Sequence, residues 1–251
     1  GGKEMVRGDL KPQDFSSKVS DALRGEPGTS FILKVLRPQK NDSTVMEFKL
    51  TRKNIRNNPV PYYGMVHDSI GYLSLTGFTD NCSKDVKKAS IELKDKGAKA
   101  LIFDLRDNGG GSLQEAVDII NFFVPKGKEI VVTKGKIRQA AGSFKTTSEP
   151  IDAAIPLAIL VNGNSASASE IMSGSMQDLD RAVIIGTRTF GKGLVQTTRQ
   201  LPYNGTLKVT TSKYYIPSGR CIQAIDYAKK NADGSVARIP DSLTHVFYTE
   251  A

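Results

Sequence analysis

The stretch PLAILVNGNSASASEIMSGSMQDLDRAVIIG, residues 156–186, is the clearest indication of the fold class of this chain. It opens with an apolar run at 156–162 that is typical of a buried strand, and residues 168–179 follow with the apolar spacing of a helix. A second apolar run at 182–186 closes the stretch. Because two buried strands joined through a helix pair in parallel, the stretch predicts one crossover unit of an α/β core.

The same alternation continues on the N-terminal side of this unit. Strands are expected at 70–75 and 100–105, and helical patterns follow them at 86–93 and 113–124. Beyond Gly193 the pattern changes to β, with runs rich in Thr, Val and Tyr. The fold class expected from the residues is therefore α/β, with largely parallel pairing in the core and a β-rich C-terminal part.

Residues 1–52 carry a separate and smaller pattern. A helix is expected at 14–23, and two strands at 30–37 and 44–52 are joined by a polar turn. One helix and one hairpin bury too little apolar surface to form a stable domain alone. We therefore expect a small N-terminal segment, 1–52, followed by one large domain, 53–251.

Composition and charge exclude several classes of function. The formal net charge is +9, but the basic residues are scattered and no RNA-binding or zinc-finger motif accompanies them, so no nucleic-acid partner is expected. Cys82 and Cys221 lie far apart, and His67 and His245 stand alone, so we expect no metal, no cofactor and no histidine-based hydrolase. No apolar run approaches the ~18–20 residues of a membrane span, and no signal-peptide pattern is present.

Three serines alternate with alanines at the start of the helix in the stretch 156–186. They are Ser165, Ser167 and Ser169, and Ser167 also has Glu170 three residues later, the Ser-x-x-Glu form of a capping box. The serines are therefore either capping and turn residues or include a nucleophile exposed at the end of a strand, as in a nucleophile elbow. Spacing alone does not choose among the three.

A glycine-rich loop, DLRDNGGGS at 104–112, follows another expected core strand. Glycine lets the backbone approach a ligand closely, and a helix start favours negative charge, so the loop suits an oxyanion hole or a phosphate cradle. A tight strand-to-helix turn is the alternative. Ser112 and Glu115 have the spacing of a second capping box.

The loop GTRTFGKGLVQ at 186–196 places Lys192 between two glycines. Gly191 and Gly193 allow another segment to approach closely, and the lysine is either a general base or a solvated side chain. The loop also matches the start of a phosphate-binding Walker A motif, but Gly193 stands where Ser or Thr must hold magnesium. The residues after it are poor helix formers, so nucleotide binding is disfavoured.

The serine and lysine loops are more informative together than apart. A serine nucleophile needs a base, and a lysine serves when burial lowers its pKa from about 10.4 toward 7. Gln196, four residues after Lys192, is placed to accept a hydrogen bond from the amine. We expect Glu170 to point away from the lysine or to be paired elsewhere, because its charge would oppose deprotonation of the amine.

Four segments resemble the C-terminal processing, or tail-specific, serine peptidases. Residues 161–196 resemble the catalytic segment of that family, and 101–117 its glycine-rich loop. Residues 23–38 resemble the later part of its PDZ domain, and 214–223 its β segment after the catalytic residues. The resemblance implies a ClpP/crotonase-like catalytic core at 53–251, preceded by a truncated PDZ-like segment at 1–52.

The resemblance also implies a role for each site residue. Ser167 aligns with the family nucleophile, Lys192 with its general base and Gln196 with the residue that orients the lysine. The N–H groups of Ala168 and a glycine of the 109–111 run, with Gly110 preferred, would hold the oxyanion. Ser165 and Ser169 would then be structural.

The implied activity is that of a serine endopeptidase that cleaves unstructured C-terminal regions of proteins through an acyl-enzyme. The alternative is a catalytically silent scaffold or protein-binding module with the peptidase fold, although Ser167, Lys192 and Gln196 are all present. Family members typically act in the bacterial cell envelope or in plastids, so the resemblance implies a location in the bacterial envelope, with the periplasm preferred. Since the first PDZ strands and the family's later segments have no counterpart here, we expect the chain to be part of a longer family member.

Overall fold

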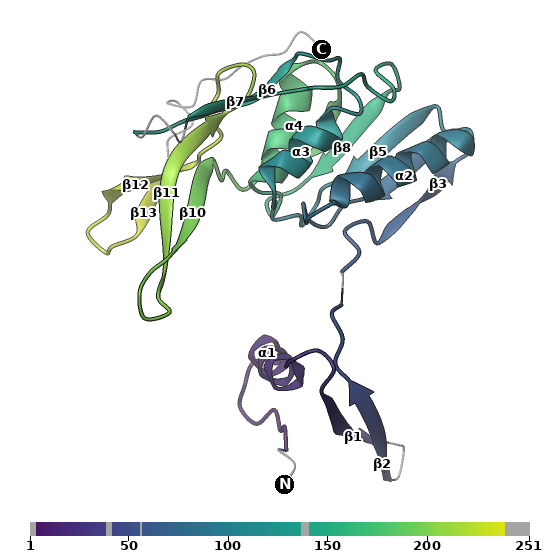
Figure 1. Ribbon diagram of the computed structural model, residues 1–251, viewed down its shortest axis with the longest axis vertical. Helices are drawn as coiled ribbons and strands as arrows, with labels where there is room; N and C mark the ends of the chain where they lie inside the picture. The colour runs from purple at the N-terminus through teal and green to yellow at the C-terminus, as the bar shows by residue number, and fades with distance from the viewer. Residues whose placement is uncertain (1–3, 39–41, 56, 137–140, 239–251) are drawn as a thin grey trace. The chain divides into compact units, whose positions relative to one another are not determined.

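The computed structural model describes residues 4–38, 42–55, 57–136 and 141–238. The chain divides into two compact units, Gly1–Asn57 and Asn58–Ala251. Both are drawn in Figure 1, and each is described by itself.

The smaller unit consists of one helix and one hairpin. Helix α1 spans Pro12–Leu23, and strands β1 (Ser30–Pro38) and β2 (Ser43–Thr51) pair antiparallel from Ser30 opposite Thr51 to Pro38 opposite Ser43. One face of this ribbon is apolar over three successive cross-strand pairs, with Phe31, Leu33, Val35, Met46, Phe48 and Leu50. Even so, none of the described residues of the unit is buried, because a helix and two strands enclose too little surface.

The larger unit is built on a five-stranded sheet in the order β3-β4-β5-β8-β9. Its strands are β3 (Tyr62–His67), β4 (Ile70–Ser74), β5 (Ala100–Asp104), β8 (Leu157–Val161) and β9 (Val183–Gly186). Strands β4, β5, β8 and β9 run parallel, and β3 pairs antiparallel with β4 at one edge. The predicted α/β core is confirmed, and residues 156–186 form its β8–α4–β9 crossover unit.

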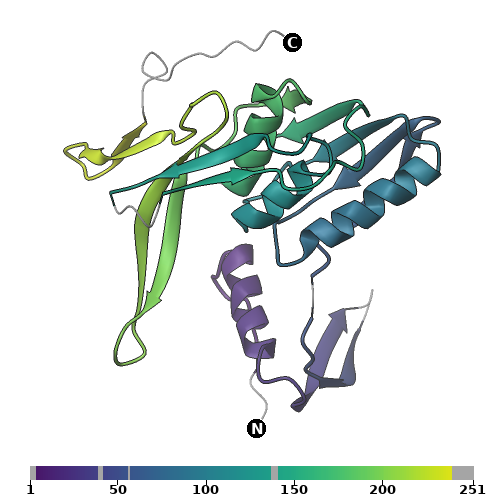
Figure 2. The ribbon, with the colours of Figure 1, turned by 45° about the horizontal axis from the view of Figure 1, so that its top comes forward.

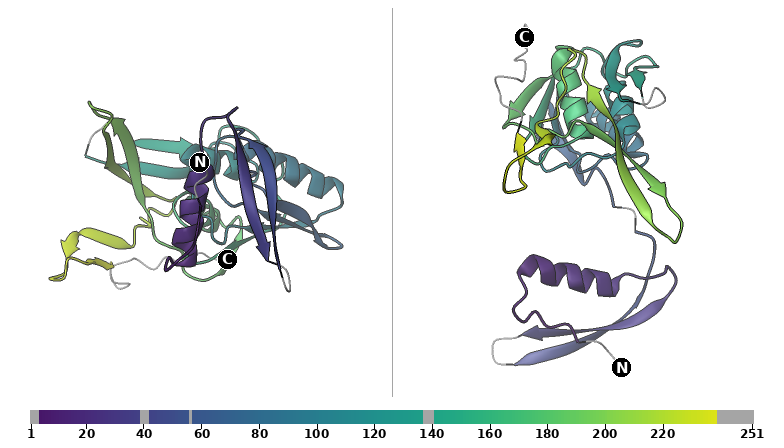
Figure 3. Two further views of the ribbon diagram at one scale, coloured as in Figure 1. Left: turned by 90° about the horizontal axis from the view of Figure 1, so that it is seen from below. Right: turned by 90° about the vertical axis from the view of Figure 1, so that its left-hand side faces the viewer.

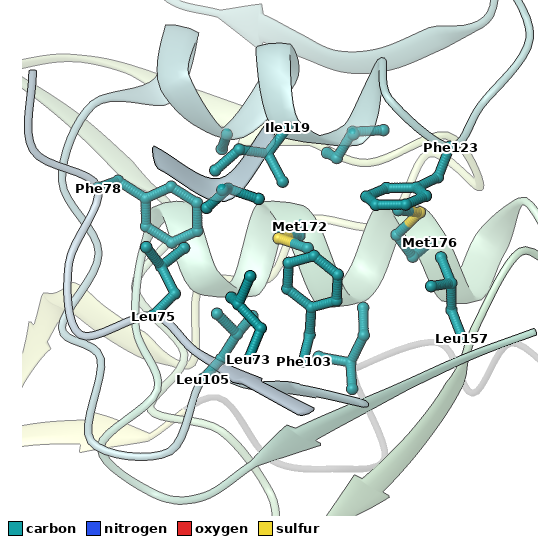
Figure 4. Packing of buried hydrophobic residues seen from close by; sticks show 14 of the residues in the cluster. Leu73, Leu75, Phe78, Phe103, Leu105, Ile119, Phe123, Leu157, Met172 and Met176 are labelled. Atoms are coloured by element: carbon teal, nitrogen blue, oxygen red, sulfur yellow. The ribbon is translucent and has the colours of Figure 1, made fainter. Parts of the chain in front are cut away.

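Three helices connect the parallel strands: α2 (Cys82–Asp95), α3 (Leu113–Ile120) and α4 (Ala168–Asp178). Helix α3 packs against both α2 and α4. Figure 4 shows side chains of α3, α4 and the strands meeting in one apolar layer. Phe103 of β5 meets Phe123 edge to face, with ring centroids 5.6 Å apart, and Met172 and Met176 of α4 are fully buried beside them. This burial fixes the α4 start, and with it the serine turn, against the sheet.

The start of α3 corrects one expectation. The Ser112 side chain accepts the Glu115 N–H at 3.4 Å, as an N-cap should. The Glu115 carboxylate does not return to Ser112. It accepts the N–H groups of Asn81 and Ser83, at 2.7 and 2.8 Å, and so caps the start of α2. The second half of the predicted capping box is therefore wrong, because tertiary packing offers the carboxylate two better donors.

A second, antiparallel sheet has the order β10-β11-β6-β7. Its strands are β6 (Glu129–Lys134), β7 (Gly142–Lys145), β10 (Leu194–Gln200) and β11 (Thr206–Tyr215). A small hairpin follows, β12 (Ile225–Lys230) and β13 (Val236–Arg238), which confirms the β-rich C-terminal part. Figures 2 and 3 show β10 and β11 extending as a long ribbon whose outer half is exposed.

In the described part of the chain, neither cysteine nor His67 belongs to a cluster that could bind a metal ion. Cys82 is buried and Cys221 is partly exposed, and both are free thiols. His67 ends β3 on the surface, and His245 lies outside the described residues. Within the described ranges, no three His, Cys, Asp or Glu side chains gather as they would around a metal ion. No helix in those ranges has the length and apolarity needed to cross a bilayer.

Candidate active site

The serine turn lies between the end of β8 and the first turn of α4. Ser167 is the N-cap residue of α4, with φ 59° and ψ −113°. A positive φ is uncommon outside glycine and is held only when the surrounding structure enforces it. Ser167 is partly exposed, so its side chain stands at the end of the sheet within reach of solvent.

The two flanking serines face inward. Both are fully buried. The Ser165 hydroxyl donates to the Leu105 carbonyl at 2.7 Å, and the Ser169 hydroxyl donates to the Asn108 carbonyl at 2.8 Å. These two hydroxyls therefore join the serine turn to the segment that carries the glycine-rich loop.

Gly110 of that loop lies directly against the serine turn. A Cβ built on Gly110 would sit 2.7 Å from the Ser167 Cβ and 2.9 Å from the Ala168 nitrogen, and its φ is 97°. The Gly110 N–H donates to the Asn108 side chain at 2.9 Å. By contrast, no acceptor within the described ranges takes the N–H groups of Gly109, Gly111 or Ala168.

Lys192 lies in a tightly bonded loop between β9 and β10. Besides its contacts with Glu170, the loop's backbone forms hydrogen bonds with three other segments: Phe190 N–H to Ser165 O, Ala224 N–H to Gly191 O, Tyr214 hydroxyl to Lys192 O, Gly193 N–H to Gln223 Oε1, and Tyr214 N–H to Gly193 O. A Cβ on Gly191 would lie 2.2 Å from the Ala224 Cβ, and one on Gly193 would lie 2.6 Å from the Gln223 nitrogen. The close approach expected of both glycines is confirmed.

A buried carboxylate joins the serine turn to the lysine loop. Glu170 is 3% exposed, and its Oε2 accepts the N–H groups of Ser167 and Lys192, each at 2.8 Å. Its Oε1 accepts the Gly191 N–H at 2.6 Å and the Thr189 hydroxyl at 2.8 Å. Among the described residues no ion pair involves Lys192, so Glu170 is paired elsewhere, as expected.

Tyr214 of β11 was not foreseen from the sequence. It is 2% exposed, and its hydroxyl donates to the Lys192 carbonyl. Burial raises the pKa of the Tyr214 phenol above its ordinary value, and the nearby Ser167 side chain opposes this in part. In the sequence, Tyr214 is marked only by its place in a β run and at the start of the family-like segment 214–223, neither of which indicates a contact with Lys192.

Gln196 is exposed on β10, opposite Thr210 and just after a bulge. Within the described part of the chain, no hydrogen bond joins its side chain to Lys192, and none joins the Ser167 hydroxyl to the Lys192 amine. The structure thus brings together the serine turn, the glycine-rich loop and the backbone of the lysine loop.

Comparison with known proteins identifies the family. Residues 69–229 match the family model of peptidase family S41. The chain belongs to peptidase family S41. The matched range contains the serine turn, the glycine-rich loop and the lysine loop, so the resemblance to C-terminal processing peptidases is confirmed.

The relatives of this S41 chain include named processing proteases. A carboxy-terminal-processing protease of Bartonella bacilliformis is 39% identical over 83% of this chain and 48% of its own length. A probable CtpA-like serine protease of Staphylococcus epidermidis is 36% identical over 84% of this chain and 41% of its own. The chain therefore spans about half the length of these curated relatives.

Solved structures give the same result for the fold. The photosystem II D1 C-terminal processing protease superposes with a TM-score of 0.60 and 31% identity, covering 82% of this chain and 56% of that one. A putative S41 protease from Bacteroides fragilis superposes with a TM-score of 0.57 over 81% of this chain and 59% of its own. At 20% identity, the second likeness concerns the fold alone.

Proposed function

We propose that this chain carries the catalytic centre of a serine endopeptidase that cleaves unstructured C-terminal regions of proteins. The observation that carries the proposal is the position of Ser167. Its neighbours Ser165 and Ser169 commit their hydroxyls to buried carbonyls, whereas Ser167 is partly exposed at the start of α4. The names of the Bartonella relative and of the D1 protease support protein C-termini as the substrate class.

In the proposed reaction, the Ser167 oxygen attacks the carbonyl carbon of the scissile bond as its proton passes to the neutral Lys192 amine. The tetrahedral intermediate collapses, the C–N bond breaks, and the leaving amine takes that proton from Lys192. Water then attacks the acyl-enzyme, with Lys192 as base again, and Ser167 is released with its proton. Gln196 is proposed to accept a hydrogen bond from the amine and so to orient it.

The oxyanion is proposed to lie at the start of α4. The Ala168 N–H has no other acceptor in the described chain, and the helix N-terminus favours negative charge there. Gly110 is the second proposed donor because its Cα faces the serine. Its N–H would then exchange the Asn108 oxygen for the oxyanion, whereas Gly109 and Gly111 would donate without such an exchange.

The proposal also includes the type of catalytic core, the nature of residues 1–52 and the place of action. The catalytic core is taken as ClpP/crotonase-like and residues 1–52 as a truncated PDZ-like segment. The helix and hairpin of the smaller unit are compatible with the latter. The bacterial cell envelope, in particular the periplasm, is proposed as the place of action, in keeping with the bacterial relatives.

Cleavage of an unstructured protein substrate tests the function. The chain, its Ser167→Ala variant and buffer alone are incubated with a disordered protein, and products are followed by intact mass. Products that shorten from the C-terminal side with the chain, and are absent with Ser167→Ala, are expected. Absence of cleavage by the unmodified chain, while it still binds the protein, would favour the silent scaffold instead.

A further inference from the structure

We infer that Glu170 is a positioning residue that sets the spacing between the nucleophile and the base. The inference rests on the proposed function, because it concerns how that Ser–Lys site is held together. The supporting observation is that one carboxylate binds two segments that are separate in the chain, the serine turn before α4 and the loop before β10.

The Glu170 carboxylate links the two segments through shared hydrogen bonds, and we call this linkage the brace. A single oxygen, Oε2, accepts the N–H of Ser167 and the N–H of Lys192, each at 2.8 Å. The two backbone nitrogens therefore lie no further apart than the sum of these distances. The other oxygen binds the Gly191 N–H and the Thr189 hydroxyl, which prevents the carboxylate from rotating away.

Only an ionised carboxylate satisfies this arrangement. Four donors converge on two oxygens, and a carboxylate is the side chain that accepts with both. An amide in the same place would turn an NH₂ group toward at least one backbone N–H and leave that donor unsatisfied inside the protein. The negative charge is accommodated by the four donors and by the N-terminus of α4, so it acts as an acceptor for the backbone rather than as a partner for the lysine amine.

The consequence concerns catalysis more than folding. The α4 start is already fixed by its apolar face, and the lysine loop is already bonded to Tyr214 and Gln223. Loss of the brace should therefore let the two loops shift relative to each other while the fold persists. Misplacement of reacting groups by about 1 Å lowers rates by about 100-fold, whereas substrate binding elsewhere is unaffected.

Three variants test the brace: Glu170→Gln, Thr189→Val and Thr189→Ser. Each is measured for the rate at which a fluorophosphonate labels Ser167, for kcat and KM on a peptide, for thermal unfolding, and for amide hydrogen exchange at 189–193. We expect Glu170→Gln to slow labelling and kcat by about 100-fold with KM within about twofold, and to speed exchange at Gly191 and Lys192 only. Thr189→Val should lower the labelling rate and kcat several-fold. Thr189→Ser, which keeps the hydroxyl, should have the labelling rate and kcat of the unmodified chain.

The outcomes separate the brace from the proposed function. Labelling of Glu170→Gln within twofold of the unmodified chain, with unchanged exchange, overturns the brace. If Glu170→Gln fails to fold, equal labelling of the Val and Ser variants at position 189 overturns it instead. If the unmodified chain is not labelled at all, the proposed function fails. In that case hydrogen exchange alone tests the brace. Faster exchange confined to Gly191 and Lys192 in Glu170→Gln, or in Thr189→Val but not in Thr189→Ser, supports it. Unchanged exchange overturns it.

Discussion

Gly110 and Ser167 lie so close that a Cβ on the glycine would sit 2.7 Å from the Cβ of the serine. The same Cβ would lie 2.6 Å from the Ala166 carbonyl oxygen, and the glycine φ of 97° is unfavourable for any other residue. The glycine-rich loop therefore packs directly against the serine turn at Gly110, and no side chain fits between them.

Gly110→Ala tests this fit. Because backbone atoms on the serine turn cannot move aside cheaply, we expect labelling of Ser167 by a fluorophosphonate to fall by about 100-fold. Gly163→Ala is the matched control, since it lies in the same turn and its Cβ would meet nothing nearer than 3.9 Å. Equal labelling of the two variants would show that the contact between Gly110 and Ser167 is unimportant.

The three serines should separate cleanly on substitution. Ser167→Ala is expected to abolish cleavage and keep the unfolding temperature. Ser165→Ala and Ser169→Ala should keep most activity but lower the free energy of unfolding by about 0.5–1.5 kcal/mol, because each removes a buried hydrogen bond to a carbonyl that keeps one backbone N–H partner. Cleavage assays and thermal unfolding measure both effects, and turnover by a folded Ser167→Ala variant would exclude it as the nucleophile.

Lys192→Arg should lower kcat by about 10²–10⁴-fold, because a guanidinium cannot accept the serine proton at neutral pH. The backbone of residue 192 keeps its bonds to Glu170 and Tyr214, so folding should be unchanged. Near-normal turnover of Lys192→Arg would rule out a lysine base. Arg199→Lys, on the exposed part of β10, is the control for a change of cation type and should have no effect.

Tyr214→Phe removes a buried hydroxyl that donates to the Lys192 carbonyl. We expect a loss of about 1–3 kcal/mol in the free energy of unfolding at neutral pH, because that carbonyl is left unpaired. The raised pKa also predicts a pH effect. Since the neutral phenol is the form that the fold favours, its contribution is complete below the ordinary value of 10.0 and is lost as the pH rises from there toward the folded value.

Denaturation at a series of alkaline pH values checks this sign. The unmodified chain should lose stability above pH ~10 more steeply than Tyr214→Phe, which has no phenol to ionise. Parallel curves for the two proteins would mean that Tyr214 titrates as it does in the unfolded chain.

The core was predictable because its strands are short apolar runs bounded by polar or glycine residues and its helices have clear apolar periodicity. Strands β3 and β7 were missed for the opposite reason. Residues 62–67 form an edge strand without a buried alternation, and residues 142–145 are a short, mostly exposed strand that reads as a polar loop. Such edge strands are identified by their pairing partners, which local patterns do not specify.

The site was predictable in its residue types but not in its contacts. Gly191 and Gly193 indicated a close approach, yet nothing in the local pattern indicated that residues 223–224 would be the approaching segment. Glu170 was read as a cap of its own helix, which it is, but its bonds to the lysine loop cross 21 and 22 residues of sequence. Such contacts depend on where the loop after the crossover unit lies in space, and tertiary packing determines that position.

In the proposed reaction, Ser167 forms the acyl-enzyme. The most direct measurement is to mix the chain with a peptide substrate, quench the reaction in acid and map the adduct by mass spectrometry. We expect the acyl part of the cleaved substrate to be esterified to Ser167, and Ser167→Ala to carry no adduct. An adduct on another residue, or turnover that leaves Ser167 unmodified, would contradict it.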